Sequence, residues 1–176
     1  MSANAFDVFR ADVEDAEGIA AVHVRAFDVT YRDAFPDLAA AAPDLETRVA
    51  SWQELLEPDT EAAFTLVAEQ RAVAVGFCSL ATPSREASDG ERTAEIAAFF
   101  VAPSRWGNGV GTALLTKALE ELADEGWTEV TVWVLVDNAP ARKFYERFGF
   151  AADGAAGPDP MTERPKMRLR IALPVT

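Results

Sequence analysis

The sequence has few of two residue types on which much protein chemistry depends, with one cysteine and one histidine among 176 residues. A single cysteine cannot close an intramolecular disulfide, and with a single histidine it cannot build a zinc site of the usual kind. We therefore expect no bound metal. A lone cysteine is also typical of a protein that works in the reducing cytoplasm.

Long hydrophobic runs are missing as well. The longest stretch without a charged residue covers residues 72–84, too short for a membrane-spanning helix of about 20 residues. The first residues carry neither the basic start nor the apolar run of a signal peptide, so we expect no membrane partner. Hydrophobic residues at 49% and charged residues at 26% are typical of a globular protein, and the length predicts a single domain over residues 1–176.

Positive charge is scarce, because 16 lysines and arginines face 29 acidic residues and leave a net charge of −13. A field of that sign repels nucleic acid and favours cationic small molecules or peptides. Solubility alone explains an acidic surface equally well. We predict no nucleic-acid partner, and composition leaves open whether the chain forms a homodimer.

The hydrophobic pattern predicts alternating strands and helices. Helices are expected after an N-cap at Asp12 and over residues 44–57, 112–125 and 138–148, with residues 28–43 either a mobile loop or a broken helix. Strands are expected over residues 6–10, 64–70, 72–81, 93–101, 130–136 and 166–173, with turns or loops over 82–91 and 151–160. This order indicates an α/β protein with a mixed sheet.

Three glycines at alternate positions, Gly107, Gly109 and Gly111, stand between a predicted strand and a predicted helix. Such a turn lets backbone N–H groups converge on an anion, although a glycine pair alone more often marks only a tight turn. Residues 96–119 contain no Asp or Glu in a chain with 29 acidic residues, and they include Arg105 and Lys117. This local clearance of negative charge favours a phosphate site. The spacing matches neither a Walker loop nor a dinucleotide-binding fingerprint.

The sequence resembles the GNAT N-acetyltransferase superfamily in two segments, which occur in the same order as two motifs of that family. The first is Trp106-Gly-Asn-Gly-Val-Gly111, and the second, about 30 residues on, is Val136-Asp-Asn-Ala-Pro-Ala-Arg-Lys-Phe-Tyr-Glu-Arg-Phe-Gly-Phe150. The strand before the glycines resembles the family's pantetheine-binding strand, and residues 24–36 resemble its acceptor-side helices more loosely. Where the family prefers Arg or Gln, this chain has Trp106, so backbone amides and the adjacent Arg105 would meet the pyrophosphate.

The resemblance implies a fold and an activity. The fold would be a mixed, mostly antiparallel central sheet, splayed at the cofactor strand, with helices on both faces. The activity would be transfer of an acetyl group from acetyl-CoA to a primary amine of a small molecule or peptide, by direct attack on the thioester within a ternary complex. A non-catalytic acetyl-CoA-binding or interaction module on the same fold is the alternative. A transferase acting on charged tRNA is disfavoured by the charge of −13.

The resemblance also implies roles for individual residues. Tyr145 would face the cofactor sulfur, unless it is only a core aromatic, and Asn138 would hydrogen-bond the cofactor, unless it is only an N-cap. The backbone of a strand would pair with the pantetheine arm, and the glycine turn would hold the pyrophosphate; the residues are Phe99, Phe100 and Val101 for the strand and Trp106, Gly107, Asn108, Gly109, Val110, Gly111 and Thr112 for the turn.

The sequence has no comparably clear motif for the general base that deprotonates the amine or for the residues that bind the acceptor. Glu95, on the predicted cofactor strand, would take the amine proton directly or through water, and a surface glutamate at a strand end is an equal interpretation. The acceptor would be met by His23, Phe27, Tyr31 and Trp133. His23 alone on a helical stripe is more often a packing residue than a base, and Cys78 is expected to be a small core residue.

Overall fold

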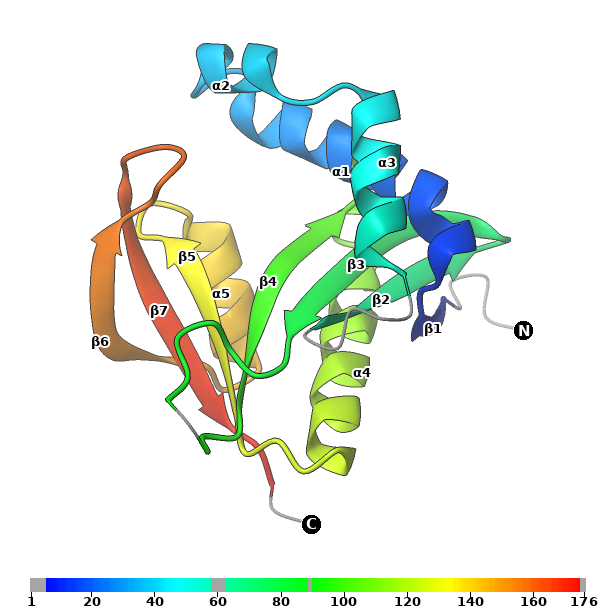
Figure 1. The fold of residues 1–176 in the computed structure, drawn as a ribbon. Helices are drawn as coiled ribbons and strands as arrows, with labels where there is room; N and C mark the ends of the chain where they lie inside the picture. Colours follow the sequence, from blue (N-terminus) through cyan, green and yellow to red (C-terminus); the bar gives the residue numbers. More distant parts are fainter. Residues whose placement is uncertain (1–5, 58–62, 89, 175–176) are drawn as a thin grey trace. The chain divides into compact units, whose positions relative to one another are not determined.

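The computed structural model describes residues 6–57, 63–88 and 90–174. Seven strands lie in the order β1-β2-β3-β4-β5-β7-β6, which gives the mixed, mostly antiparallel sheet that the sequence predicted (Figure 1). The chain divides into two compact units. The first takes in the chain up to Leu80 and Ala98–Glu120, and the second takes in Ala81–Ala97 and the chain from Glu121. Strand β4 (Thr93–Val101) contributes residues to both, and the single domain stays a prediction.

The first unit combines strands with all the helices of the first half of the chain. Its strands are β1 (Asp7–Arg10), β2 (Ala63–Gln70), β3 (Val73–Ala81) and the second half of β4. Its helices are α1 (Ala16–Tyr31), α2 (Pro36–Ala41), α3 (Leu45–Leu55) and most of α4 (Val110–Asp124). β1 and β2 are antiparallel, with Asp7 opposite Glu69.

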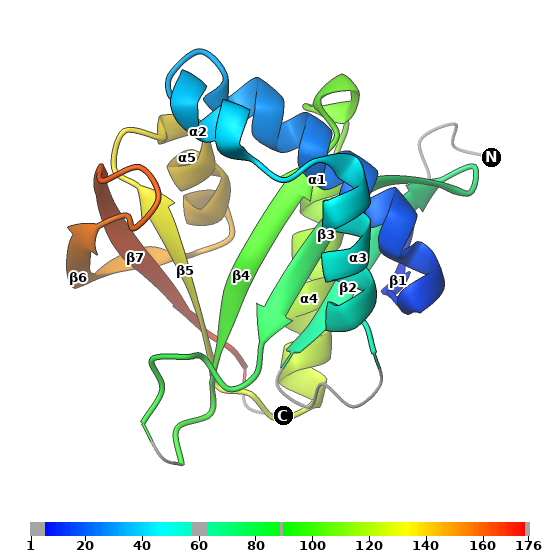
Figure 2. The same cartoon turned by 45° about the horizontal axis from the view of Figure 1, so that its top comes forward.

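Helices cover both faces of the strands in this unit. Phe77 of β3 is fully buried in a cluster with residues of α1 and with Trp52 of α3. The preceding residue, Gly76, faces α4, because a Cβ built there lies 2.9 Å from a methyl group of Val110 and 3.0 Å from one of Leu114. Figure 2 shows α1 and α3 on the near side of β2 and β3 and α4 on the far side.

Capping side chains define where the early helices begin. Asp12 accepts a hydrogen bond from the Glu14 N–H at 2.8 Å, and the Asp12 N–H donates to Asp15 at 2.9 Å, closing a capping box at a 3-10 turn that leads into α1. This confirms the predicted cap. Residues 28–43 follow the broken-helix interpretation, since α1 runs to Tyr31 and α2 follows after a turn.

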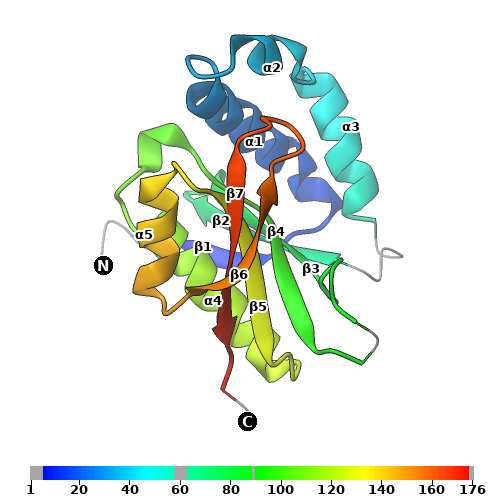
Figure 3. The same cartoon turned by 90° about the vertical axis from the view of Figure 1, so that its left-hand side faces the viewer.

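Besides the first half of β4 and the end of α4, the second unit contains β5 (Glu129–Leu135), α5 (Ala139–Arg147), β6 (Ala151–Pro158) and β7 (Pro165–Ala172). β7 is antiparallel to β5 and to β6, and Figure 3 shows α5 to one side of these strands. The first half of β4 is parallel to β5, and their register covers Thr93–Ile96 against Glu129–Val132. Within the described residues, no helix is long and apolar enough to cross a membrane.

Strand β6 corrects one prediction. Residues 151–160 were expected to form a loop, because alanine, glycine, proline and aspartate have low strand propensity. The backbone of Ala151–Pro158 pairs with β7 instead, around a bulge between Ala152 and Ala156. Within the bulge, the Asp153 carboxylate accepts hydrogen bonds from Arg168 at 2.7 Å and Arg170 at 3.2 Å. The pairing with β7 and these contacts override local propensity.

Candidate functional site

The glycine turn lies in the first unit, between the end of β4 and α4. Gly107 and Gly109 have φ values of +76° and +88°, a backbone conformation that side chains with a Cβ rarely adopt. A Cβ built at either position meets nothing within 4 Å. These glycines are therefore required by the backbone conformation rather than by crowding, and the space above the turn is open.

The start of α4, directly after the turn, has backbone donors with no acceptor inside the helix. The first helical bond of α4 runs from the Ala113 N–H to the Gly109 carbonyl at 3.0 Å. The N–H groups of Val110, Gly111 and Thr112 precede this bond, so they have no acceptor inside the helix, and they lie at the positive end of the helix dipole. The 15-residue helix begins two residues earlier than predicted, which places these donors directly after Gly109.

Trp106 braces the turn. Its indole Nε1 donates to the Val101 carbonyl at 2.8 Å, while 53% of the residue remains exposed. The Trp106 side chain therefore ties the turn to the end of β4. The Trp106 side chain has no positive charge for a phosphate, which leaves the backbone amides and the adjacent Arg105 to meet an anion at the turn.

A position that the sequence analysis missed brings α4 close to the sheet. Gly76 sits mid-strand, and a Cβ there would also lie 3.2 Å from the Phe100 carbonyl. Glycine at this place lets the first turn of α4 pack directly on β3. An isolated glycine inside a strand pattern is the signal that could have identified it.

The predicted acceptor residues of α1 form an aromatic cluster in the first unit. The His23 ring lies 4.9 Å from that of Phe100 and 6.4 Å from that of Phe27, and the Phe27 ring lies 4.5 Å from that of Tyr31. Trp52 of α3 and Phe77 of β3 also belong to the cluster, with rings 5.9 Å and 5.5 Å from that of His23. His23, predicted to meet the acceptor, and Phe100, predicted to pair with the pantetheine arm, thus lie side by side.

His23 is held neutral in this cluster. Burial, and then the nearby charge of Arg48, lowers its pKa from 6.5 to about 4. Trp52 Nε1 donates to His23 Nδ1 at 3.2 Å, so the ring proton is on Nε2. At neutral pH His23 is therefore a hydrogen-bond donor through Nε2.

In the second unit, Glu95 is buried rather than on the surface, with 5% exposure. Its Oε2 accepts from the Ser84 hydroxyl at 3.2 Å and from the Arg85 N–H at 3.3 Å, and its Oε1 accepts from the Arg85 guanidinium at 2.9 Å. A carboxylate has about four acceptor positions, so one remains beyond these three bonds.

Tyr145 and Asn138 are both on α5. Tyr145 is 5% exposed, and its ring lies 5.2 Å from Phe144 and 5.4 Å from Phe150 in edge-to-face arrangements. The Asn138 side-chain oxygen accepts from the Ala141 N–H at 3.2 Å, which confirms the N-cap interpretation and leaves the amide NH₂ as a donor.

Two further predicted residues have defined surroundings. The Trp133 ring is covered by the Lys166 ammonium at 4.4 Å from its centroid and by the Arg168 guanidinium at 5.7 Å. Cys78 is fully buried, as expected of a core residue, and burial raises the pKa of its thiol.

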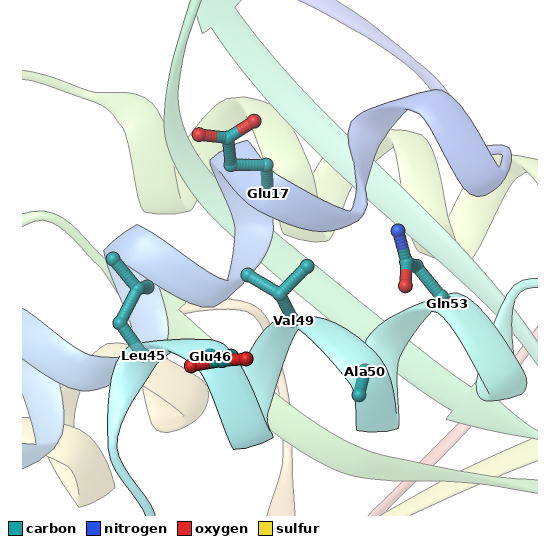
Figure 4. A pocket seen from close by; sticks show the side chains of 6 residues that line it. All are labelled: Glu17, Leu45, Glu46, Val49, Ala50 and Gln53. Carbon is teal, nitrogen blue, oxygen red and sulfur yellow. The ribbon is translucent and has the colours of Figure 1, made fainter.

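A groove between α1 and α3 is separate from the predicted residues. It is lined by Glu17, Leu45, Glu46, Val49, Ala50 and Gln53 (Figure 4). No group of three or more His, Cys, Asp or Glu side chains that could hold a metal is found in the described part of the chain.

Comparison with known proteins identifies the family. The model of the acetyltransferase (GNAT) family matches residues 26–150, and the chain belongs to this family. A mycothiol acetyltransferase from Brachybacterium faecium is 36% identical over 140 residues, covering 80% of this chain and 39% of the relative. The chain thus spans about two fifths of that relative's length.

Solved structures share the fold. A putative GNAT acetyltransferase from Desulfovibrio desulfuricans has a TM-score of 0.74 at 21% identity, covering 96% of this chain and 99% of the other. A putative acetyltransferase from Salmonella typhimurium, solved with its cofactor acetyl-CoA, has a TM-score of 0.69 at 22% identity and covers 98% and 96%. The GNAT-like fold expected from the sequence is confirmed.

Proposed function

We propose that this protein is an acetyl-CoA-dependent N-acetyltransferase that transfers an acetyl group to a primary amine by direct attack on the thioester. The single observation that carries the proposal is the glycine turn. In a chain of the GNAT family, it presents three backbone donors at the start of α4 within a segment free of acidic residues. A pyrophosphate is the group that such a turn suits best.

The cofactor would extend from this turn along β4. The turn, Trp106 to Thr112, would hold the pyrophosphate through backbone amides, and the backbone of Phe99 to Val101 would pair with the pantetheine arm. The Asn138 amide would add a hydrogen bond. These assignments rest on the family motifs at the matching positions and on the local geometry of each segment.

The leaving group explains the proposed role of Tyr145. As the amine attacks the thioester carbon, an oxyanion forms. It would accept a hydrogen bond from a backbone N–H of β4. The C–S bond then breaks, and the thiolate takes a hydrogen bond or proton from the tyrosine hydroxyl. A thiol has a pKa near 8.5 and tyrosine near 10, so full transfer is uphill by roughly 2 kcal/mol. The proposed assistance is therefore either a hydrogen bond to the departing sulfur or complete donation of the proton.

The amine must first lose a proton. An alkylammonium of pKa about 10.4 costs roughly 4.6 kcal/mol to deprotonate at pH 7. We propose that Glu95 takes this proton through a water molecule at its remaining acceptor position. His23, Phe27, Tyr31 and Trp133 are proposed to line the acceptor site for a small-molecule or peptide amine.

The experiment compares Gly109→Asp with Gly90→Asp by calorimetric titration with coenzyme A. Both glycines have similar positive φ values, +88° and +85°, and open space for a side chain, so the backbone strain is matched. The carboxylate at position 109 should weaken binding by at least about tenfold, or 1.4 kcal/mol, and the one at position 90 should not. Equal affinities in the two folded variants would place the cofactor elsewhere.

Release of free thiol from acetyl-CoA across a panel of primary amines tests the transfer itself. Thiol release that depends on the amine is the expected result. Coenzyme A binding without thiol release for any amine would instead support the non-catalytic binding module.

A further inference from the structure

Although the protein is strongly acidic, Arg48 has no carboxylate partner among the residues that the structure describes. It lies on α3, one turn before Trp52, and its guanidinium is over the face of Phe27, 6.0 Å from the ring centroid. Its Nε is buried and has no hydrogen-bond partner in the described residues. By contrast, Arg85 pairs with Glu95, and both Arg168 and Arg170 pair with Asp153.

An unsatisfied buried donor on a charged group is destabilising. Leaving such a group without a partner removes its hydration and supplies no hydrogen bond in exchange. Burial also lowers the pKa of Arg48 from its ordinary value, which reports the same loss of hydration. A chain with 29 acidic residues has many carboxylates that could pair with this arginine, and none does so among the described residues.

A second donor lies beside it. His23 is close enough to feel the charge of Arg48, and both side chains contact Phe27. Because Trp52 occupies His23 Nδ1, the Nε2–H is the remaining polar group of the ring, and it has no acceptor within the part of the chain that the structure describes. Arg48 supplies a cation and His23 supplies a neutral donor. Both lie beside the Phe27 ring, and all three residues belong to the first unit.

We propose that Arg48 and His23 form a carboxylate-binding subsite, so that the acceptor is an amine that also carries a carboxylate group. The guanidinium fork matches a carboxylate in two parallel hydrogen bonds, and a bound anion would compensate the charge that the part-buried side chain carries without a counterion in the described residues. The subsite rests on the proposed function for its role in transfer. Its binding of carboxylates is a property of Arg48 and His23 alone, and can be measured without turnover.

The binding test uses the single histidine as a probe. His23 gives the only histidine imidazole signals in an NMR spectrum, so titration with sodium butyrate and with neutral butyramide reports on one site. Butyrate should shift the His23 signals saturably and raise its pKa, because an anion offsets the charge of Arg48, whereas butyramide should not. Absence of a saturable butyrate shift in the folded protein would overturn the proposal.

The turnover test compares matched acceptors. The ratio of kcat/KM for glycine, β-alanine and 4-aminobutyrate to that for each corresponding amide measures the carboxylate preference. For the preferred member this ratio should be about tenfold or more in the wild type, as expected of a charge-assisted hydrogen bond, and should fall towards one in Arg48→Gln. Arg48→Lys, which keeps the charge but not the fork, should retain part of the preference.

Arg25→Gln is the matched control, since Arg25 is an exposed arginine on α1, and it should leave both the ratio and the butyrate shift unchanged. A carboxylate preference that survives in folded Arg48→Gln would overturn the proposal. Equal use of 2-aminoethyl phosphate would show a general anion site and would overturn the assignment to a carboxylate. If no amine is acetylated while butyrate still shifts the His23 signals, the transferase function fails and the subsite stands.

Discussion

The surroundings of Tyr145 allow its hydroxyl to be separated from its ring. The ring is 5% exposed and has edge-to-face contacts with Phe144 and Phe150. Such aromatic pairs depend on the ring and its orientation, which phenylalanine shares. Removal of the oxygen alone therefore tests chemistry without removing the packing.

We predict that Tyr145→Phe lowers kcat by about 10² to 10⁴ and leaves the affinity for acetyl-CoA nearly unchanged. The reason is that assistance to a departing thiolate exists mainly in the transition state. Steady-state kinetics, calorimetry and a melting curve on the one variant make the measurement. A wild-type kcat with a lowered melting temperature would show that Tyr145 is only a core aromatic.

At the level of elements, Glu95 attaches a connecting segment to β4. Ser84 and Arg85 lie between β3 and β4, and three hydrogen bonds from them converge on this one carboxylate. The Arg85 side chain is 69% exposed, so its ion pair contributes at most about 1 kcal/mol to stability. Glu95 therefore holds this segment mainly through the geometry of three hydrogen bonds rather than through a strong ion pair.

For Glu95→Gln we expect a pH-dependent defect if Glu95 is the base. Activity should fall most near neutral pH and recover at high pH, where more of the amine is already neutral. Arg85→Gln is the control, since it removes the ion pair and keeps the carboxylate, and its profile should keep the wild-type shape. A Glu95→Gln profile that is scaled down equally at every pH would exclude Glu95 as the base.

Hydrophobic periodicity predicts most elements of this fold but not all. The buried run in β5 and the stripe of leucines in α4 were predictable because burial decides those positions. β6 was not, since its alanines and glycines carry no strand signal, and the partner that orders it lies later in the chain. Gly76 was visible as a strand glycine, but its closeness to α4 is a property of the folded chain.

The candidate site was predicted unevenly for a similar reason. The glycine turn is local in sequence, so its spacing and its missing acids were readable directly. The brace from Trp106 to Val101 spans only five residues, yet it required coordinates to detect. Arg48 was missed, because the absence of a partner is a three-dimensional fact that no residue pattern records.

For the whole molecule, His23 and Asp153 are among the groups whose shifted pKa makes stability depend on pH. His23 has its pKa lowered to about 4, so between pH 6.5 and 4 the unfolded chain binds a proton that the folded chain does not. Burial alone would raise the pKa of Asp153, but hydrogen bonds from Ala155, Arg168 and Arg170 outweigh it and lower the pKa. The stabilisation that Asp153 contributes is fully present above its ordinary pKa. It is lost as the pH falls below that value and through the lowered pKa of the folded protein.

We predict that the free energy of unfolding falls by at most about 3 kcal/mol through His23 as pH is lowered from 6.5 to 4. Urea unfolding of the wild type and of His23→Gln, which keeps an acceptor for Trp52, isolates this contribution from that of the carboxylates. The difference between the two proteins should shrink across this range. A constant difference, or a His23 NMR midpoint near 6.5, would contradict the prediction.

The brace at the glycine turn has an optical consequence. Trp106 places a half-exposed indole, hydrogen-bonded to the Val101 carbonyl, beside the proposed phosphate site. Indole emission depends on the polarity and hydration around the ring. Trp52 in the aromatic cluster is only 5% exposed, so a change of solvent at the turn affects the emission of Trp106 more than that of Trp52. The residue that replaces the family's charged or amide side chain thereby gives the unlabelled protein an intrinsic fluorophore at the turn.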